Sequence, residues 1–360
     1  MIMHKLRHLL DASLVLTGIV LLFLALPRWS SADEPASPDV EFCLSCHSNK
    51  DLELVLPSGE KRSLFIDSEI FARSVHGGKL RCTDCHSDIS TYPHPARSFK
   101  NLREFALAYQ ETCKSCHFDN YTKTLDSVHY TLLAKGNLKA PLCVDCHGAH
   151  NVSRPGVPKS RISATCSRCH QGIYDQYKRS VHGEALQGGN TDAPACVDCH
   201  RAHNIEDPRT SSFRLSTPEL CARCHTDEKL MKKYGLSTMV LQTYLKDFHG
   251  MTASAQKKQQ MTPSVVTAVC TDCHGVHDIL SVKDPKSAVM KANLIKVCAK
   301  CHAGATKNFP AAWLSHYQPS PEKAPLVYYV RLFYQIFIPL VIVGLILQIL
   351  LHIWRVVVNR

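Results

Sequence analysis

The sequence lacks the short motifs by which many enzymes are recognised. Its 360 residues contain no glycine-rich phosphate loop, no arrangement typical of a nucleophile triad and no separate metal-ligand cluster. It also lacks any cysteine outside one pattern, because all 18 cysteines occur as Cys-x-x-Cys followed by histidine. The sequence therefore gives no indication of nucleotide or acyl-transfer chemistry, and its chemistry must come from the repeated cysteine pattern.

Nine copies of Cys-x-x-Cys-His account for all the cysteines. One copy could arise by chance, and Cys-x-x-Cys alone also suits zinc or a redox dithiol. Nine copies, each closed by histidine, are the attachment signature of c-type haem, in which two thiols form thioethers and the histidine ligates iron. The sequence predicts nine covalently attached haem c groups. The cysteines are Cys43, Cys46, Cys82, Cys85, Cys113, Cys116, Cys143, Cys146, Cys166, Cys169, Cys196, Cys199, Cys221, Cys224, Cys270, Cys273, Cys298 and Cys301, and the histidines are His47, His86, His117, His147, His170, His200, His225, His274 and His302.

The chain has little polypeptide for each of these groups. Residues 33–325 provide about 33 residues per motif, too few for an apolar core of the usual size. We therefore expect the porphyrins to supply much of the core. The predicted fold is mostly α and irregular: an elongated multihaem cytochrome c built from repeated paired-haem units, with short helices, little sheet and one C-terminal transmembrane helix.

The formal charge of +11 could suggest binding to nucleic acid or to an anionic membrane surface. Each ferric haem, however, adds roughly one net negative charge, because two ionised propionates outweigh the residual +1 of the iron centre. Nine haems cancel most of the excess, so the sequence predicts no binding to nucleic acid.

The N-terminus has the features of a secretory signal peptide. A basic start at Lys5 and Arg7 precedes an apolar run from Leu14 to Leu26, and small residues suit cleavage after Ala32. We assign residues 1–32 to this signal, with an uncleaved anchor as the alternative. Either interpretation exports the haem region, as covalent haem attachment and 18 cysteines also indicate.

The C-terminus carries a second membrane signal. The stretch from Leu332 to Leu351 is almost continuously apolar and long enough to span a bilayer. Arg355 and Arg360 follow it, so the positive-inside rule places residues 355–360 in the cytoplasm and a nine-haem domain, residues 33–317, in the periplasm. Residues 318–325 form the linker and 326–354 the helix in the inner membrane. Gln335 and Gln348 suggest a face turned toward partner helices, with a plain anchor as the alternative.

The motifs belong to a repeat. Four times, a motif is followed by a helix-like stretch that ends in a histidine, then by a second motif and a further histidine, and a half-length unit closes the series. Each second motif carries an aspartate before its second cysteine: Asp84, Asp145, Asp198 or Asp272. We assign no chemistry to these aspartates and expect them to be solvated.

The histidine count predicts the iron ligation. Of 21 histidines, nine lie in the motifs and His4, His8 and His352 lie near the ends, which leaves His76, His94, His129, His150, His182, His203, His249, His277 and His316. Nine irons and nine further histidines favour bis-histidine, low-spin haem. Surface histidines, with a methionine such as Met290 as a ligand instead, are the alternative.

Three of these histidines follow a motif histidine by only three residues: His150, His203 and His277. They cannot easily reach the opposite face of the same iron. We expect each of them to ligate a neighbouring haem and so to draw haems into close pairs.

Two histidines per iron leave no position for a small-molecule substrate. This disfavours a reductase and favours a chain of low-potential centres that pass electrons one at a time. A reductase with a hidden open haem, or a membrane-tethered electron store, are the alternatives. We predict no enzymatic activity for the chain on its own.

The paired motifs with Ser-Val-His and Cys-Val-Asp-Cys-His-Gly-Ala-His, and the single tail helix, resemble the nine-haem periplasmic subunits of inner-membrane Cbc-type quinone-linked cytochrome bc complexes. The resemblance implies a membrane cytochrome b partner that oxidises quinol, and periplasmic c-type cytochromes as acceptors in anaerobic respiration. Unlike the fused members, this chain has one span and cannot build a haem b site. Electrons would enter at the haem of Cys298 and leave near that of Cys43.

Overall fold

A computed structural model of the protein describes residues 38–95, 97–259, 267–310 and 316–359. The predicted signal peptide, residues 1–32, lies outside the described residues. The haem motifs all lie within them, as do the nine further histidines.

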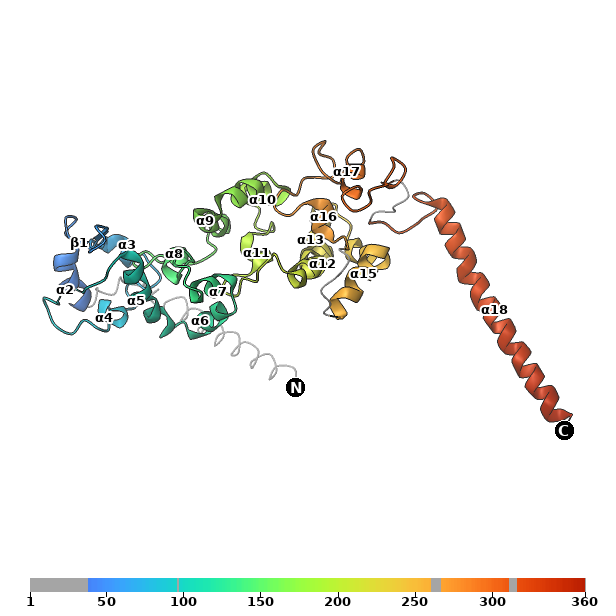
Figure 1. Cartoon of the computed structure of the whole chain (residues 1–360), viewed down its shortest axis with the longest axis horizontal. Helices are drawn as coiled ribbons and strands as arrows, with labels where there is room; N and C mark the ends of the chain where they lie inside the picture. The colour runs from blue at the N-terminus through green and yellow to red at the C-terminus, as the bar shows by residue number, and fades with distance from the viewer. Residues whose placement is uncertain (1–37, 96, 260–266, 311–315, 360) are drawn as a thin grey trace, which may run out of the picture. The chain divides into compact units, whose positions relative to one another are not determined.

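The described chain is mostly helical, with short helices joined by long loops (Figure 1), which confirms the predicted fold class. The helices are α2 (Pro38–His47), α3 (Ser68–Ala72), α4 (Cys82–Cys85), α5 (Leu102–Lys114), α6 (Phe118–Leu125), α7 (Val128–Ala134), α8 (Cys143–His147), α9 (Ser160–Lys178), α10 (Val181–Gln187), α11 (Cys196–His200), α12 (Ser211–His225), α13 (Glu228–Lys233), α14 (Val240–Lys246), α15 (Phe248–Lys258), α16 (Cys270–His274), α17 (Leu294–Cys298) and α18 (Pro325–Val358).

The sheet in the described chain is one antiparallel hairpin, β1 (Glu53–Val55) with β2 (Lys61–Ser63). Its turn contains Gly59 at φ 81°, a left-handed conformation that favours glycine. The carbonyl of Leu64, just after β2, accepts a hydrogen bond of 2.9 Å from Nδ1 of His47. The hairpin thus fixes the ring of the first motif histidine and leaves its Nε2 free to bind a metal.

In the last three composite repeats the middle histidine lies in the first turn of a helix, α7, α10 or α15, whereas His76 of the first repeat lies in a bend after α3. The residue two places before each middle histidine accepts a hydrogen bond through its side chain: Ser74, Ser127 and Ser180 through Oγ, and Asp247 through Oδ1, from backbone N–H groups 3.0–3.1 Å away. Ser127, Ser180 and Asp247 are the N-caps of their helices. Capping of this kind typically stabilises a helix by about 1 kcal/mol. In α7 and α10 the recurring Ser-Val-His is therefore a helix start that places the histidine.

Apolar packing within the described polypeptide is limited. One cluster consists of Leu215, Tyr244, Ala253 and Val269, and another of Leu186, Ala193 and Ala195. In both regions a tyrosine hydroxyl donates to a backbone carbonyl just before a motif: Tyr177 to Pro194 at 2.6 Å and Tyr244 to Ala268 at 3.0 Å. Burial raises the pKa of Tyr177 to about 12, so this donor stays protonated.

The chain divides into two compact units. One comprises the residues up to Cys116 together with Cys143–Arg154, and the other comprises His117–Leu142 and Pro155–Arg360. The division falls inside the region assigned above to a single haem domain, whose bounds stay a prediction.

Helix α18 is a single helix of 34 residues that contains the predicted span, residues 326–354 (Figure 1). At 1.5 Å per residue it is about 51 Å long, more than a bilayer core requires. Its apolar side chains are exposed throughout, and it is the one described helix long and apolar enough to cross a membrane. It is consistent with anchoring to a membrane.

Candidate haem-attachment sites

The motifs lie on helical turns. Four of them form the short helices α4, α8, α11 and α16, and four begin at or near the C-terminal ends of α2, α5, α12 and α17. The remaining one, from Cys166 to His170, lies in the middle of α9 at a kink. Residues three and four apart lie on the same helix face, so both thiols and the imidazole point to one side. At three motifs the histidine leaves the helical conformation, with φ and ψ of −98° and 54° at His86, −105° and 41° at His117, and −109° and 43° at His170.

The 18 thiols, all within the described residues, form no disulfide. In eight of the nine motifs the first cysteine is partly buried and the second is exposed, and Cys273 is the second cysteine that is partly buried. The thiols are therefore available for thioether bonds, and eight of the nine motifs present them at two depths.

Attachment points of successive motifs lie in contact. The first thiols of three motif pairs are hydrogen-bonded: Cys113 donates to Cys143, Cys166 to Cys196 and Cys221 to Cys270. As acceptors in these bonds, Cys143 and Cys196 have their pKa lowered to about 7 and about 6. Haems attached at such neighbouring points must themselves lie side by side.

The aspartate of the second motif in each pair is partly exposed to solvent, as expected, but it also has hydrogen-bond partners that the sequence analysis did not identify. Asp84, Asp198 and Asp272 each accept a hydrogen bond of 2.7–2.8 Å from the backbone N–H just before the first cysteine of their motif. The carboxylate thus caps the turn that carries the two thiols. This bond lowers the pKa of Asp84.

These aspartates also form ion pairs with basic side chains that the sequence analysis did not identify. The pairs are Arg81–Asp84, Arg103–Asp145, Lys159–Asp198 and Arg214–Asp272. The basic residues of the last three pairs lie seven to ten residues before the first cysteine of the preceding motif. That recurring position was the sequence signal that could have revealed them.

Fourteen of the 18 histidines of the predicted ligand set face one another as seven pairs of rings, with centroids 6.0–6.3 Å apart. The others, His76, His117, His147 and His203, also take part in contacts. The pairs are His47–His94, His86–His150, His170–His129, His225–His182, His200–His277, His302–His249 and His274–His316.

This separation fits an iron between the two rings. A histidine nitrogen lies about 2.0 Å from a bound metal and roughly 1.1 Å from its ring centre, so two opposed ligands have centroids about 6.2 Å apart. Ordinary aromatic pairs spread over about 4.5–7 Å. Ring packing alone is not expected to give seven separate pairs whose centroid separations agree within 0.3 Å.

Each pair joins histidines from different motifs or repeats. A histidine that follows a second motif meets the ring of an earlier motif, as in His150 with His86 and His277 with His200. A middle histidine meets a later motif, as in His182 with His225. His150 and His277 thus face the ring of another motif and not that of the motif they follow.

A recurring backbone hydrogen bond sets this register. The N–H of the valine before a middle histidine donates to the carbonyl two residues beyond a later histidine: Val128 to Ile205 at 2.8 Å and Val181 to Ile279 at 2.9 Å. The same bond joins Val75 to Val152 at 2.8 Å. Successive repeats are thus interlocked.

Burial keeps most of the paired rings neutral. It is the main cause of the lowered pKa of His150 and His182, each to about 4, and the neighbouring imidazole lowers it further. Burial likewise lowers the pKa of His86, His200 and His274. A neutral imidazole has a free lone pair, which is the form that binds iron.

No cluster of three or more His, Cys, Asp or Glu side chains that could hold a metal ion occurs in the part of the chain that the structure describes. The ligand histidines occur as pairs. Pairs suit a haem iron, because the porphyrin supplies the four equatorial nitrogens and the protein the two axial ligands.

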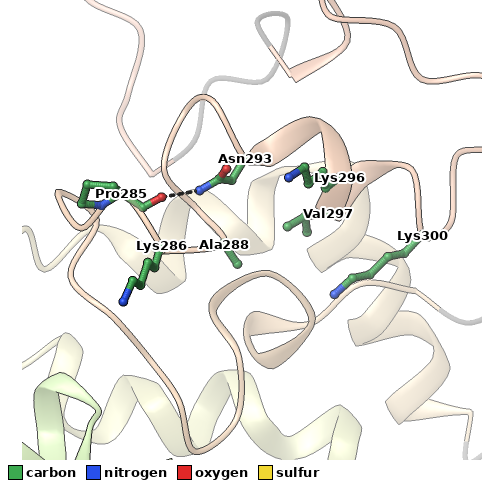
Figure 2. A pocket seen from close by; sticks show the side chains of 7 residues that line it. All are labelled: Pro285, Lys286, Ala288, Asn293, Lys296, Val297 and Lys300. Carbon is green, nitrogen blue, oxygen red and sulfur yellow. Dashed lines mark hydrogen bonds between the residues drawn. The ribbon is translucent and has the colours of Figure 1, made fainter.

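A shallow hollow of about 380 Å³ lies beside the ninth motif (Figure 2). Ala288 and Val297 are its apolar lining, and Lys286, Lys296 and Lys300 carry its positive charge. Val297 directly precedes Cys298, but neither the cysteines nor the histidine of the ninth motif line the hollow.

The family model described as the doubled CXXCH motif matches residues 134–173 and 189–230, which is less than a quarter of the chain. The matched segments contain four of the nine motifs, from Cys143 to His225. No curated protein and no solved structure matches. The match and the paired motifs indicate a multihaem c-type cytochrome, with covalently bound haem c and a function in electron transfer.

Proposed function

We propose that this chain is the periplasmic electron-transfer subunit of a quinol-oxidising complex in the inner membrane. It would carry nine haem c groups, each with two histidine ligands, and pass electrons from a membrane cytochrome b to periplasmic c-type cytochromes in anaerobic respiration.

The observation that carries the proposal is the constant separation of the seven histidine pairs. An iron held between two imidazoles has no free position, so it can accept and donate electrons without binding a substrate. Two histidine ligands also favour a low potential compared with histidine and methionine, which suits a menaquinol donor.

Helix α18 supports a position at the membrane. His316, ten residues before the predicted span of residues 326–354, faces His274, and the last motif histidine, His302, faces His249. The haem at Cys298 would therefore have the attachment motif nearest along the chain to the bilayer, and the haem at Cys270 would have the nearest histidine ligand. We therefore propose that electrons enter at the haem of Cys298 and leave near that of Cys43. The positive residues after the span support an orientation with the haems in the periplasm and residues 355–360 in the cytoplasm.

The proposal is tested by purifying the complex in mild detergent through a tag on this chain and recording a pyridine haemochrome spectrum. Haem b beside haem c is expected, since a single span cannot build a haem b site. Haem c alone would contradict the quinol-oxidising partner. The intact mass of the chain gives the haem count, and fewer than nine haems would contradict the proposed stoichiometry.

A further inference from the structure

We propose that three ion pairs are positioning residues that clamp the two attachment motifs of a haem pair together: Arg103–Asp145, Lys159–Asp198 and Arg214–Asp272. The inference rests on haem attachment at these motifs and deepens the proposed function, because it names the residues that set the geometry between paired haems.

The three pairs have the same place in the repeat. Nη1 of Arg103 lies 2.8 Å from Oδ2 of Asp145, Nζ of Lys159 lies 3.0 Å from Oδ2 of Asp198, and Nη2 of Arg214 lies 2.5 Å from Oδ2 of Asp272. In each case the base belongs to the segment that carries the first motif of a pair, and the aspartate lies inside the second motif.

These bases are more buried than those of the other ion pairs. The side chains of Arg103, Lys159 and Arg214 are 21%, 25% and 27% exposed. In the other described pairs of lysine or arginine with a carboxylate, the base is at least 36% exposed. An exposed pair contributes little to stability, whereas a half-buried one is screened less by water and holds its geometry better.

Two of the clamps are also hydrogen-bonded to the backbone just before the second motif. Arg214 also donates to the carbonyl of Thr267 at 2.6 Å, and Lys159 donates to that of Thr191 at 3.1 Å. The same oxygen of Asp272 that binds Arg214 accepts from the N–H of Val269 at 2.7 Å. The ion pair therefore fixes the turn that carries the thiols of the second motif.

The clamped motifs are those whose first thiols touch. Arg103, Lys159 and Arg214 join the same motif pairs in which Cys113 meets Cys143, Cys166 meets Cys196 and Cys221 meets Cys270. Electron tunnelling falls off exponentially with the distance between haem edges. A clamp that fixes the separation of two attachment points thus sets the transfer rate within the pair.

The first motif pair is different and serves as an internal comparison. Its aspartate, Asp84, binds Arg81, which lies in the same turn rather than on the helix of the other motif. The clamp is therefore assigned to the three later pairs alone.

The test compares Arg214→Gln and Arg214→Lys with Arg209→Gln in the full-length haem-loaded chain. Arg209 lies five residues away and pairs with Asp207, exposed and within one loop, so its variant removes the same charge without touching a clamp. Haem content is checked first by pyridine haemochrome. The readout is the exciton couplet of the Soret circular dichroism, which reports the distance and angle between neighbouring haems.

We expect a weaker couplet in Arg214→Gln, partial recovery in Arg214→Lys and no change in Arg209→Gln, all at equal haem content. A couplet in Arg214→Gln equal to that of Arg209→Gln would overturn the clamp. If Arg214→Gln is not loaded with haem like the parent, the same comparison with Lys159→Gln and Lys159→Arg decides. A parent with fewer than nine haems, or without a cytochrome b partner, would contradict the proposed function but leave these comparisons valid.

Discussion

Arg201 holds a backbone conformation that its equivalents in the repeat give to glycine. It directly follows a motif histidine and has φ 63° and ψ −177°. The equivalent residues of two other repeats are Gly148 at φ 75° and Gly275 at φ 86°. Arg201 is the one non-glycine residue with positive φ in the described chain. We predict that Arg201→Gly stabilises the protein.

The magnitude follows from two opposing contributions. A side chain held in this glycine-specific region costs about 1–3 kcal/mol. A glycine gives the unfolded chain more freedom, which costs about 0.4–1 kcal/mol. The lost ion pair with Glu206 is long, at 3.5 Å, and exposed, so it contributes little. The net gain is about 1 kcal/mol, or roughly 2–4 °C in Tm for a unit of this size.

The assay is thermal unfolding of the haem-loaded chain in detergent, followed by far-UV circular dichroism at one fixed scan rate, because large haem proteins often unfold irreversibly. Arg201→Ala is the matched control, since it removes the same charge but keeps a Cβ at positive φ. We expect Arg201→Gly to unfold at the highest temperature of the three. A Tm equal to that of Arg201→Ala would show that the conformation costs nothing.

Three further results are expected. A Cβ at Gly183 would lie 1.9 Å from the carbonyl oxygen of Tyr177, so Gly183→Ala should lower the free energy of unfolding by about 1–3 kcal/mol. Gly172→Ala, with nothing within 4 Å of the added Cβ, should raise it by about 0.4–1 kcal/mol, and equal denaturant midpoints would refute the contrast. The folded-state pKa of His150, about 4, is below its usual value of 6.5, so the unfolded chain binds the proton first. The denaturant midpoint should therefore fall as the pH drops from about 6.5 to about 4, and a rise in that window would contradict the lowered pKa of His150. A chain that ends before Pro325 should move from the membrane to the soluble fraction with its haem spectrum unchanged, whereas retention in the membrane would show that α18 is not the anchor.

The sequence predicted the helical class and the attachment motifs because both are local. Cysteines three apart followed by histidine require one helical turn, and Ser-Val-His carries its own N-cap. Which histidine rings face each other was harder to predict from the sequence. Ser127 can cap a helix whatever the tertiary structure around it. The hydrogen bond from Val128 to Ile205 joins residues 77 positions apart, and no local sequence pattern predicts it.

The aspartates show the same limit. Asp272 looks solvated from its neighbours in sequence, yet it caps its own turn and binds Arg214, 58 residues away. The capping was open to local reasoning, because Asp272 is the third residue of its turn. The basic partner was not open to local reasoning, since its position becomes informative only when the three repeats are aligned with one another.

The central claim is that two histidines hold each iron. Electron paramagnetic resonance of the fully oxidised chain tests it most directly, with the signal intensity compared with the haem content. We predict low-spin ferric signals that account for all the haem. A high-spin signal of substantial intensity would mean that an axial position is open, and would favour a reductase over an electron carrier.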